Sequence, residues 1–195
     1  MTIQQTRITI GSLKVAEFAS EETTCFSATV YLDGKAFARA SNEGRGGNTN
    51  FEPLGRKGWN DPAFQKMLKE AEAFASSFPP EVTEYDDPQD PSQKMTIPYS
   101  LEYLVNGLVE DTRFQKRMAS AYRRTAKRRV LFLKPDGKVY QTAVIPDLTT
   151  NTARIFDVCQ KIKAKNPEAV ILNMLPPAKA VELFIKANLD QEEAA

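Results

Sequence analysis

Apolar and polar side chains alternate along the first forty residues, which predicts antiparallel strands. Every second side chain of residues 25–32 is apolar, and the looser alternation over 6–18 predicts one or two shorter strands. Asp33-Gly34 predicts a tight hairpin turn, because both positions tolerate positive φ, with 35–40 as the returning strand. We therefore expect residues 6–41 to form a β-meander. The inward side chains of its last strand are expected to be Ala36, Ala38 and Ala40.

Farther along the chain, apolar side chains recur every three or four residues, which predicts helices. The clearest covers 62–77 and begins after Asp61, a capping residue followed by proline, with Trp59 packed on its first turn. Asp136-Gly137 predicts a second hairpin, over 129–145. Further helices are predicted over 100–111, 112–128, 152–164 and 177–188. In the helix over 152–164 the inward side chains are expected to be Ile155, Phe156, Cys159 and Ile162.

These elements predict an α+β fold, with two antiparallel β-hairpin or meander units and about five α-helices. Prolines and carboxylates are concentrated in residues 81–95, which predicts an acidic linker or loop. It would separate a meander-plus-helix domain, residues 1–80, from a helix–hairpin–helix unit, residues 96–195. One domain over the whole chain is the alternative.

Charge is distributed unevenly along the chain, although 26 Lys and Arg nearly balance 25 Asp and Glu. Residues 81–111 carry eight acids and one base, whereas 112–138 carry ten bases and one acid. Like charges at i,i+4 on a helix repel each other, so we expect a counter-charge for the basic block. The sequence leaves three sources open: nucleic-acid phosphates, an acidic protein, or the chain's own acidic segment. The candidate binding residues of the basic helix are Arg113, Lys116, Arg117, Arg123, Arg124, Lys127 and Arg128.

Two other segments are candidate contact surfaces. A glycine-rich loop follows the predicted meander, and successive backbone amides in such a loop can bind an anion. It matches neither the phosphate-binding nor the dinucleotide-binding glycine motif, so a plain connector is the alternative. The loop contacts are expected at Arg45, Asn48, Asn50, Phe51, Arg56 and Lys57. The acidic surface is expected at Glu84, Asp86, Asp87 and Asp90, without the ligand spacing of an EF-hand.

The composition excludes several kinds of chemistry. Without histidine, the chain has neither imidazole-activated nucleophiles nor imidazole zinc sites, and two cysteines are too few for a thiolate zinc site. We expect Cys25 and Cys159 to be free, and we expect no cofactor, no metal site and no enzymatic activity. Carboxylate-based, Mg²⁺-dependent phosphodiester cleavage is the remaining enzyme class. No apolar run approaches the roughly 18 residues of a membrane span, and no signal-peptide pattern is present, so we expect a cytoplasmic protein without membrane contacts.

The stretch Ser20–Lys35 (SEETTCFSATVYLDGK), followed by Ala40–Gly47 (ASNEGRGG), resembles small uncharacterised proteins of bacteria and their phages. The resemblance implies an accessory protein of a phage or mobile element. Such proteins often act by binding host nucleic-acid machinery, including defence systems, and no functional residue is carried over from them.

The sequence therefore predicts a non-enzymatic accessory protein that binds nucleic acid, or a machine that processes it, through the basic helix. The loop over 42–51 is expected as a second contact. The alternative is a protein–protein inhibitor or adaptor that uses the acidic segment and the glycine loop against a host protein, for example one of a defence system.

Overall fold

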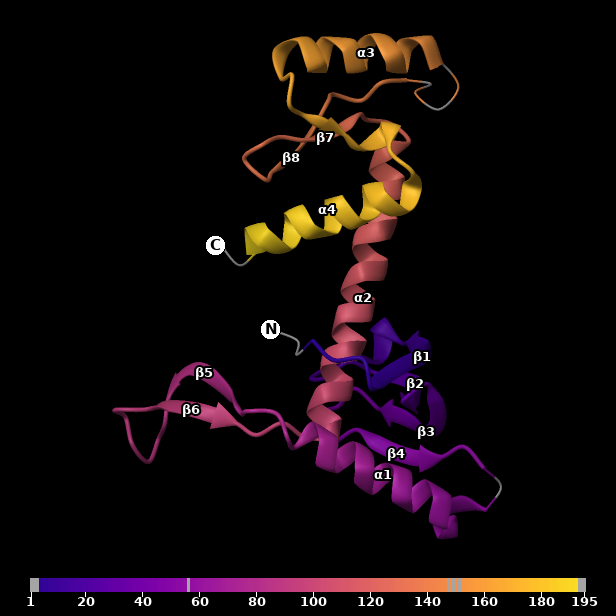
Figure 1. The fold of residues 1–195 in the computed structure, drawn as a ribbon, viewed down its shortest axis with the longest axis vertical. Coiled ribbons are helices and arrows are strands. Elements are labelled where there is room, and N and C mark those ends of the chain that lie inside the picture. The colour runs from indigo at the N-terminus through magenta and orange to yellow at the C-terminus, as the bar shows by residue number, and fades with distance from the viewer. Residues whose placement is uncertain (1–3, 56, 147, 149, 151, 193–195) are drawn as a thin grey trace. The chain divides into compact units, whose positions relative to one another are not determined.

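The computed structural model has a mixed α+β architecture, as the sequence predicted (Figure 1). Its described part contains nine strands, all in antiparallel sheets, and four α-helices. The chain divides into two compact units, Met1–Thr112 and Arg113–Ala195, and the boundary between them in the sequence falls within a helix. The division into domains around 81–95 stays a prediction. The structure describes residues 4–55, 57–146, 148, 150 and 152–192.

The first unit is built on a four-stranded antiparallel sheet in the order β1-β2-β3-β4. Side chains of β2 are alternately buried and half-buried, and Asp33 and Gly34 form the predicted turn with φ values of 49° and 76°. Strand β4 lies within a predicted loop, because four residues that end in proline are too short a pattern to indicate a strand. The strands are β1 (Ile8–Val15), β2 (Phe26–Leu32), β3 (Lys35–Asn42) and β4 (Asn50–Pro53).

A bulge in β3 changes which of its side chains reach the core. The pairing of β3 with β2 shifts by one residue, so Phe37 is buried and Ala36 is exposed. The prediction that Ala36 faces inward is therefore wrong, whereas Ala38 and Ala40 are buried as expected. The extra residue of a bulge reverses the alternation of faces, and nothing in the local pattern indicates it.

Helix α1 (Pro62–Ala75) packs its predicted apolar stripe on the core of this sheet. The Asp61 side chain accepts a hydrogen bond from the amide of Ala63 at 3.0 Å, which confirms the predicted cap. The Trp59 ring meets the Phe64 ring edge to face, with 5.3 Å between centroids. Trp59 thus packs on the first turn of α1, as predicted.

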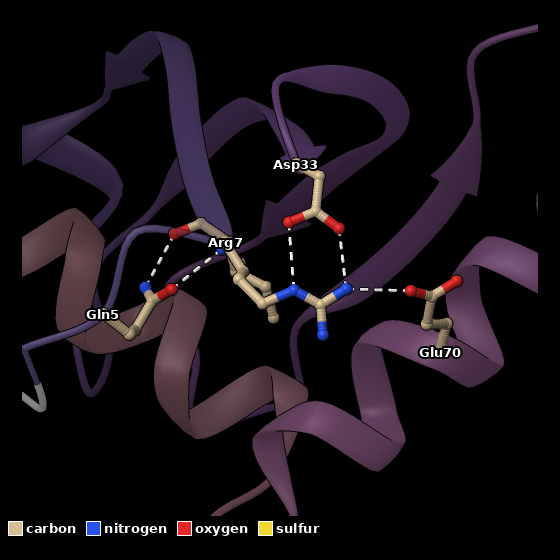
Figure 2. A network of polar contacts seen from close by, with 5 residues as sticks. Gln5, Arg7, Asp33 and Glu70 are labelled. Carbon is tan, nitrogen blue, oxygen red and sulfur yellow. Dashed lines mark hydrogen bonds and ion pairs between the residues drawn. The ribbon is translucent and has the colours of Figure 1, made fainter.

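An exposed arginine joins three elements of the first unit (Figure 2). Arg7 donates to both carboxylate oxygens of Asp33 in the β2–β3 turn, at 2.9 and 2.6 Å. Its Nη2 also donates to Glu70 of α1 at 2.8 Å, and the guanidinium lies 4.9 Å from the centre of the Phe74 ring. Hydrogen bonding to Arg7 lowers the pKa of Asp33 below its ordinary value. Gln5 exchanges two hydrogen bonds with the backbone at the start of β1.

The acidic segment forms a two-stranded hairpin, where the sequence predicted a linker or loop. Its strands are β5 (Glu81–Asp86) and β6 (Lys94–Ile97). Lys94 pairs with Asp86 across the hairpin at 2.7 Å. At the base of the hairpin, Tyr103 donates to the Glu81 carboxylate, and this bond raises the pKa of Tyr103 to about 12.

Helix α2 (Leu101–Ala126) is a single helix where the sequence predicted two, over 100–111 and 112–128. Thr112 lies at the predicted break, but its hydroxyl donates to the carbonyl of Leu108 at 2.7 Å, a bond compatible with a continuous helix. The number of described α-helices is therefore four and not five. The first half of α2 belongs to the first unit, and the second half belongs to the second.

The second unit contains a three-stranded antiparallel sheet in the order β8-β7-β9 and two further helices. Phe156 was predicted to face inward, but 59% of its surface is exposed. Ile155, Cys159 and Ile162 pack into the core as predicted, together with Val158. At about 100° per residue these four residues span about 100° of the helix, and Phe156 lies about 60° outside that arc. The elements are β7 (Leu131–Leu133), β8 (Val139–Gln141), α3 (Thr152–Lys165), β9 (Val170–Ile171) and α4 (Pro177–Glu192).

Candidate functional site

The second half of α2 and the turn that follows it present cationic side chains to solvent. The basic helix predicted over 112–128 ends at Ala126, so Lys127 and Arg128 lie in that turn. Of the seven predicted binding residues, six are exposed. Arg113 differs, because it is half-buried and has an interaction partner within the chain. We call the six exposed residues the cationic stripe: Lys116, Arg117, Arg123, Arg124, Lys127 and Arg128.

Four residues of the cationic stripe lie on α2, and helical spacing groups them on one side of it. At about 100° per residue, Lys116, Arg117, Arg123 and Arg124 fall within an arc of about 120° around the helix. The opposite side of the helix carries its buried and half-buried apolar residues, among them Phe114, Met118 and Tyr122. We divide the stripe into two rows, each of which ends with a residue of the turn after α2: Lys116, Arg123 and Lys127 in one, and Arg117, Arg124 and Arg128 in the other.

Carboxylates lie away from the cationic stripe in the described part of the second unit. Among the described residues of this unit, none of the six side chains lies within 4 Å of a carboxylate. Arg117 makes a cation–π contact, in which it lies 5.6 Å from the centre of the Phe114 ring. Acidic side chains elsewhere in the unit have other partners: Asp157 pairs with Lys161, and Glu182 pairs with Lys179.

The two units have opposite net charges. Counted over the sequence, residues 113–195 contain 16 Lys and Arg against 8 Asp and Glu, a net charge of +8. Residues 1–112 contain 10 against 17, a net charge of −7. The overall charge of +1 therefore hides a strongly basic unit that contains the cationic stripe.

The glycine-rich loop is held by a buried polar side chain that the sequence analysis did not single out. Asn42 is 5% exposed, and its side chain accepts from the amide of Gly44 at 2.8 Å and donates to the carbonyl of Gly47 at 2.8 Å. Thr49 bonds to Asn106 of α2 at 2.7 Å and closes the far end of the loop. The signal was present, because Asn42 continues the inward alternation of Ala38 and Ala40 with a polar residue.

The predicted contact residues of this loop differ in their surroundings. Arg45, Asn48, Asn50 and Lys57 are exposed. Phe51 is half-buried and packs against the core of the first unit. Arg56 lies outside the described residues. The loop therefore offers Arg45 and two asparagine side chains on an ordered backbone.

Two of the four carboxylates of the acidic surface cap turns of their own hairpin. Asp87 accepts from the amide of Gln89, and Asp90 accepts from the Ser92 hydroxyl at 2.6 Å. Hydrogen bonding to Ser92 lowers the pKa of Asp90. Glu84 and Asp86 are exposed on β5.

Neither cysteine is part of a metal or disulfide site. Cys25 and Cys159 are both free, and burial raises the pKa of the Cys159 thiol. No group of three or more His, Cys, Asp or Glu side chains that could hold a metal ion occurs in the described part of the chain.

Comparison with known proteins assigns no family to the chain. No protein-family model matches it, and no curated protein or solved structure shows significant similarity. Within the described residues, no helix has the length and apolar character required to cross a membrane. The function is therefore inferred from the residues and contacts within each unit.

Proposed function

We propose that the protein is a non-enzymatic nucleic-acid-binding protein and that the cationic stripe is its main contact surface. The observation that carries this proposal is the exposure of six cations, four on α2 and two in the turn after it, with no carboxylate within 4 Å among the described residues of their unit. Rows of this kind match a polyanion, which presents negative charges at regular intervals.

The density of like charges favours a functional reason for it. Arg123, Arg124, Lys127 and Arg128 lie within six residues, at the end of α2 and in the turn after it. Like charges this close to one another repel each other. Phosphates offset this repulsion through charge-assisted hydrogen bonds to guanidinium groups and through release of counterions.

The glycine-rich loop of the first unit is proposed as a second nucleic-acid contact. Arg45 supplies a charge, and Asn48 and Asn50 supply amide donors and acceptors suited to phosphate oxygens or base edges. Because Asn42 holds the loop backbone, these groups lose little conformational entropy on binding.

The test compares two charge-reversal variants by fluorescence anisotropy with labelled single- and double-stranded DNA and RNA. We expect R124E/R128E to weaken binding by about tenfold or more, because each lost phosphate contact removes a favourable electrostatic contribution. The matched control is K66E/K69E, which makes the same change in net charge at two exposed lysines of α1.

Thermal unfolding of each variant separates loss of binding from loss of fold. Arg124 and Arg128 are exposed, so their replacement is expected to leave the unfolding midpoint nearly unchanged. Equal affinities of R124E/R128E, K66E/K69E and the native chain would contradict the proposal.

A second candidate function, an adaptor or inhibitor that binds a basic protein, is favoured by one observation on the acidic hairpin. Val82 and Tyr85 of β5 are 65% and 74% exposed, and they flank the exposed carboxylate of Glu84. Apolar side chains set among carboxylates suit a basic protein surface better than a nucleic acid. Under this alternative, the native protein binds a basic protein and does not bind nucleic acid. The V82Q/Y85Q variant is expected to lose the binding of the basic protein.

A further inference from the structure

Beside the cationic stripe, the second unit has an open apolar groove of about 540 Å³. Phe156 and Met174 line it and are 59% and 58% exposed, which is unusual for side chains of this size. Arg123 and Lys127, from one row of the cationic stripe, line it as well. Its remaining apolar lining comes from Tyr122, Ala126, Leu148 and Ile155.

The polar groups of the groove are already used within the unit. Asn173 accepts from the amide of Leu131 at 2.7 Å and donates to the carbonyls of Ala126 and Arg129, both at 3.1 Å. The Tyr122 hydroxyl is buried and donates to the carbonyl of Leu172 at 3.2 Å. Apart from Arg123 and Lys127, the described side chains that line the groove thus offer a ligand an apolar surface.

The lining of the groove distinguishes between two anionic ligands, a nucleic acid and an acidic segment of a protein. A nucleobase placed in the groove would leave its edge donors and acceptors without partners, which costs free energy. An aliphatic or aromatic side chain carries no such groups and fits the same space. The groove therefore favours a ligand whose apolar side chains enter it and whose acidic groups lie beside those side chains.

We infer that the groove binds an acidic amphipathic helix of another protein. A helix of this kind presents apolar anchors at i, i+3 or i+4 and i+7, and a groove of this volume accommodates several of them. Acidic side chains beside the anchors would pair with Arg123 and Lys127. The row formed by Arg117, Arg124 and Arg128 is not part of the groove lining and stays available to phosphate. The inference goes beyond the proposed nucleic-acid binding and does not depend on it.

The test measures binding of a designed peptide to the full-length protein by fluorescence anisotropy. The probe is a fluorescein-labelled peptide of about 16 residues with leucines on one helical face and glutamates elsewhere. A scrambled peptide of identical composition keeps the charge and removes the apolar face. We expect the amphipathic peptide to bind and the scrambled peptide to bind at least about tenfold more weakly.

Variants of exposed groove residues locate the binding site. F156Q and M174Q are each expected to weaken peptide binding by about tenfold, because they remove an exposed apolar surface without disturbing the core. The matched control is F18Q, which replaces an apolar side chain that is 95% exposed in the first unit. Unchanged peptide affinity of both F156Q and M174Q would overturn the inference, as would equal binding of the scrambled peptide.

The two rows of the cationic stripe separate this inference from the proposed function. We expect R123E/K127E to lose affinity for the peptide and R124E/R128E to retain it, whereas both variants lose affinity for nucleic acid. If F156Q weakens binding of single-stranded DNA while the peptide does not bind, the groove is a base-stacking surface and the inference is wrong. If the peptide binds at the groove and no nucleic acid binds, the proposed function fails and the inference stands.

Discussion

Gly44 is the residue whose replacement the structure penalises most clearly. Its φ of +86° lies in the left-handed region, and an added Cβ would meet the carbonyl oxygen of Ala19 at 2.1 Å. Its own carbonyl accepts hydrogen bonds from the amides of Glu21, Glu22 and Thr23, at 2.9, 3.0 and 3.3 Å. The position thus joins the glycine-rich loop to the turn that precedes β2.

We predict that Gly44→Ala destabilises the protein by about 2–4 kcal/mol, because the backbone conformation and the close approach both exclude a side chain. Gly47→Ala is the matched control in the same loop, since nothing lies within 4 Å of an added Cβ and its φ is not in the left-handed region. Its stability is expected to change by no more than about 1 kcal/mol. Urea unfolding of both variants measures the difference, and equal midpoints would show that the loop rearranges freely.

At the scale of elements, the sequence predicts an element correctly where the residues that determine it are neighbours in the chain. The Asp61 cap with its proline, the apolar stripe that follows and the Asp33-Gly34 turn each involve neighbouring residues, and the structure confirms all three. The hairpin over 81–97 was missed because its prolines and carboxylates are typical of loops, although Val82 and Tyr85 favour strands.

For the candidate site, the basic residues could be predicted from the sequence and the groove beside them could not. The positions of the basic residues are a local property, so the sequence identified them, although the helix predicted over 112–128 ends at Ala126. The groove was not predictable, because its lining comes from four separate segments of the chain, from Tyr122 to Met174. Phe156 was predicted to face the core, but it lies outside the helix face formed by Ile155, Val158 and Cys159.

The contact between Arg7 and Asp33 joins elements and predicts a dependence of stability on pH. The pKa of Asp33 is lower in the folded chain than its ordinary value, so the contact stabilises the fold above the unfolded pKa of about 4. This contribution is lost as the pH falls through the folded pKa. Arg7→Gln should therefore lower the urea midpoint more at about pH 7 than at about pH 2.

The control for this prediction is Lys66→Gln, which removes an exposed cation of α1 that has no carboxylate within 4 Å among the described residues. Its urea midpoint relative to the native chain is expected to be nearly the same at both pH values. A constant effect of Arg7→Gln across the pH range would mean that packing of Arg7 on Phe74 stabilises the fold more than its ion pairs do.

At the scale of the whole molecule, the division of charge is the property that most directly concerns function. A basic unit of +8 and an acidic unit of −7 nearly cancel in the total, so the isoelectric point conceals the surface that the proposal uses. A positive patch of this kind attracts polyanions over a distance of about one Debye length, roughly 10 Å at 0.1 M salt. Binding through the cationic stripe must therefore depend strongly on ionic strength.

The measurement that tests the central claim most directly is the affinity of the native protein for labelled duplex DNA as a function of salt. If the six cations of the stripe each engage a phosphate, affinity should fall by about 10³ between about 50 and about 200 mM salt. The logarithm of the affinity should decrease linearly with the logarithm of the salt concentration, and R124E/R128E should have a shallower slope. Absence of binding at about 50 mM salt, or an affinity that does not change with salt, would contradict the assignment of the cationic stripe as a nucleic-acid surface.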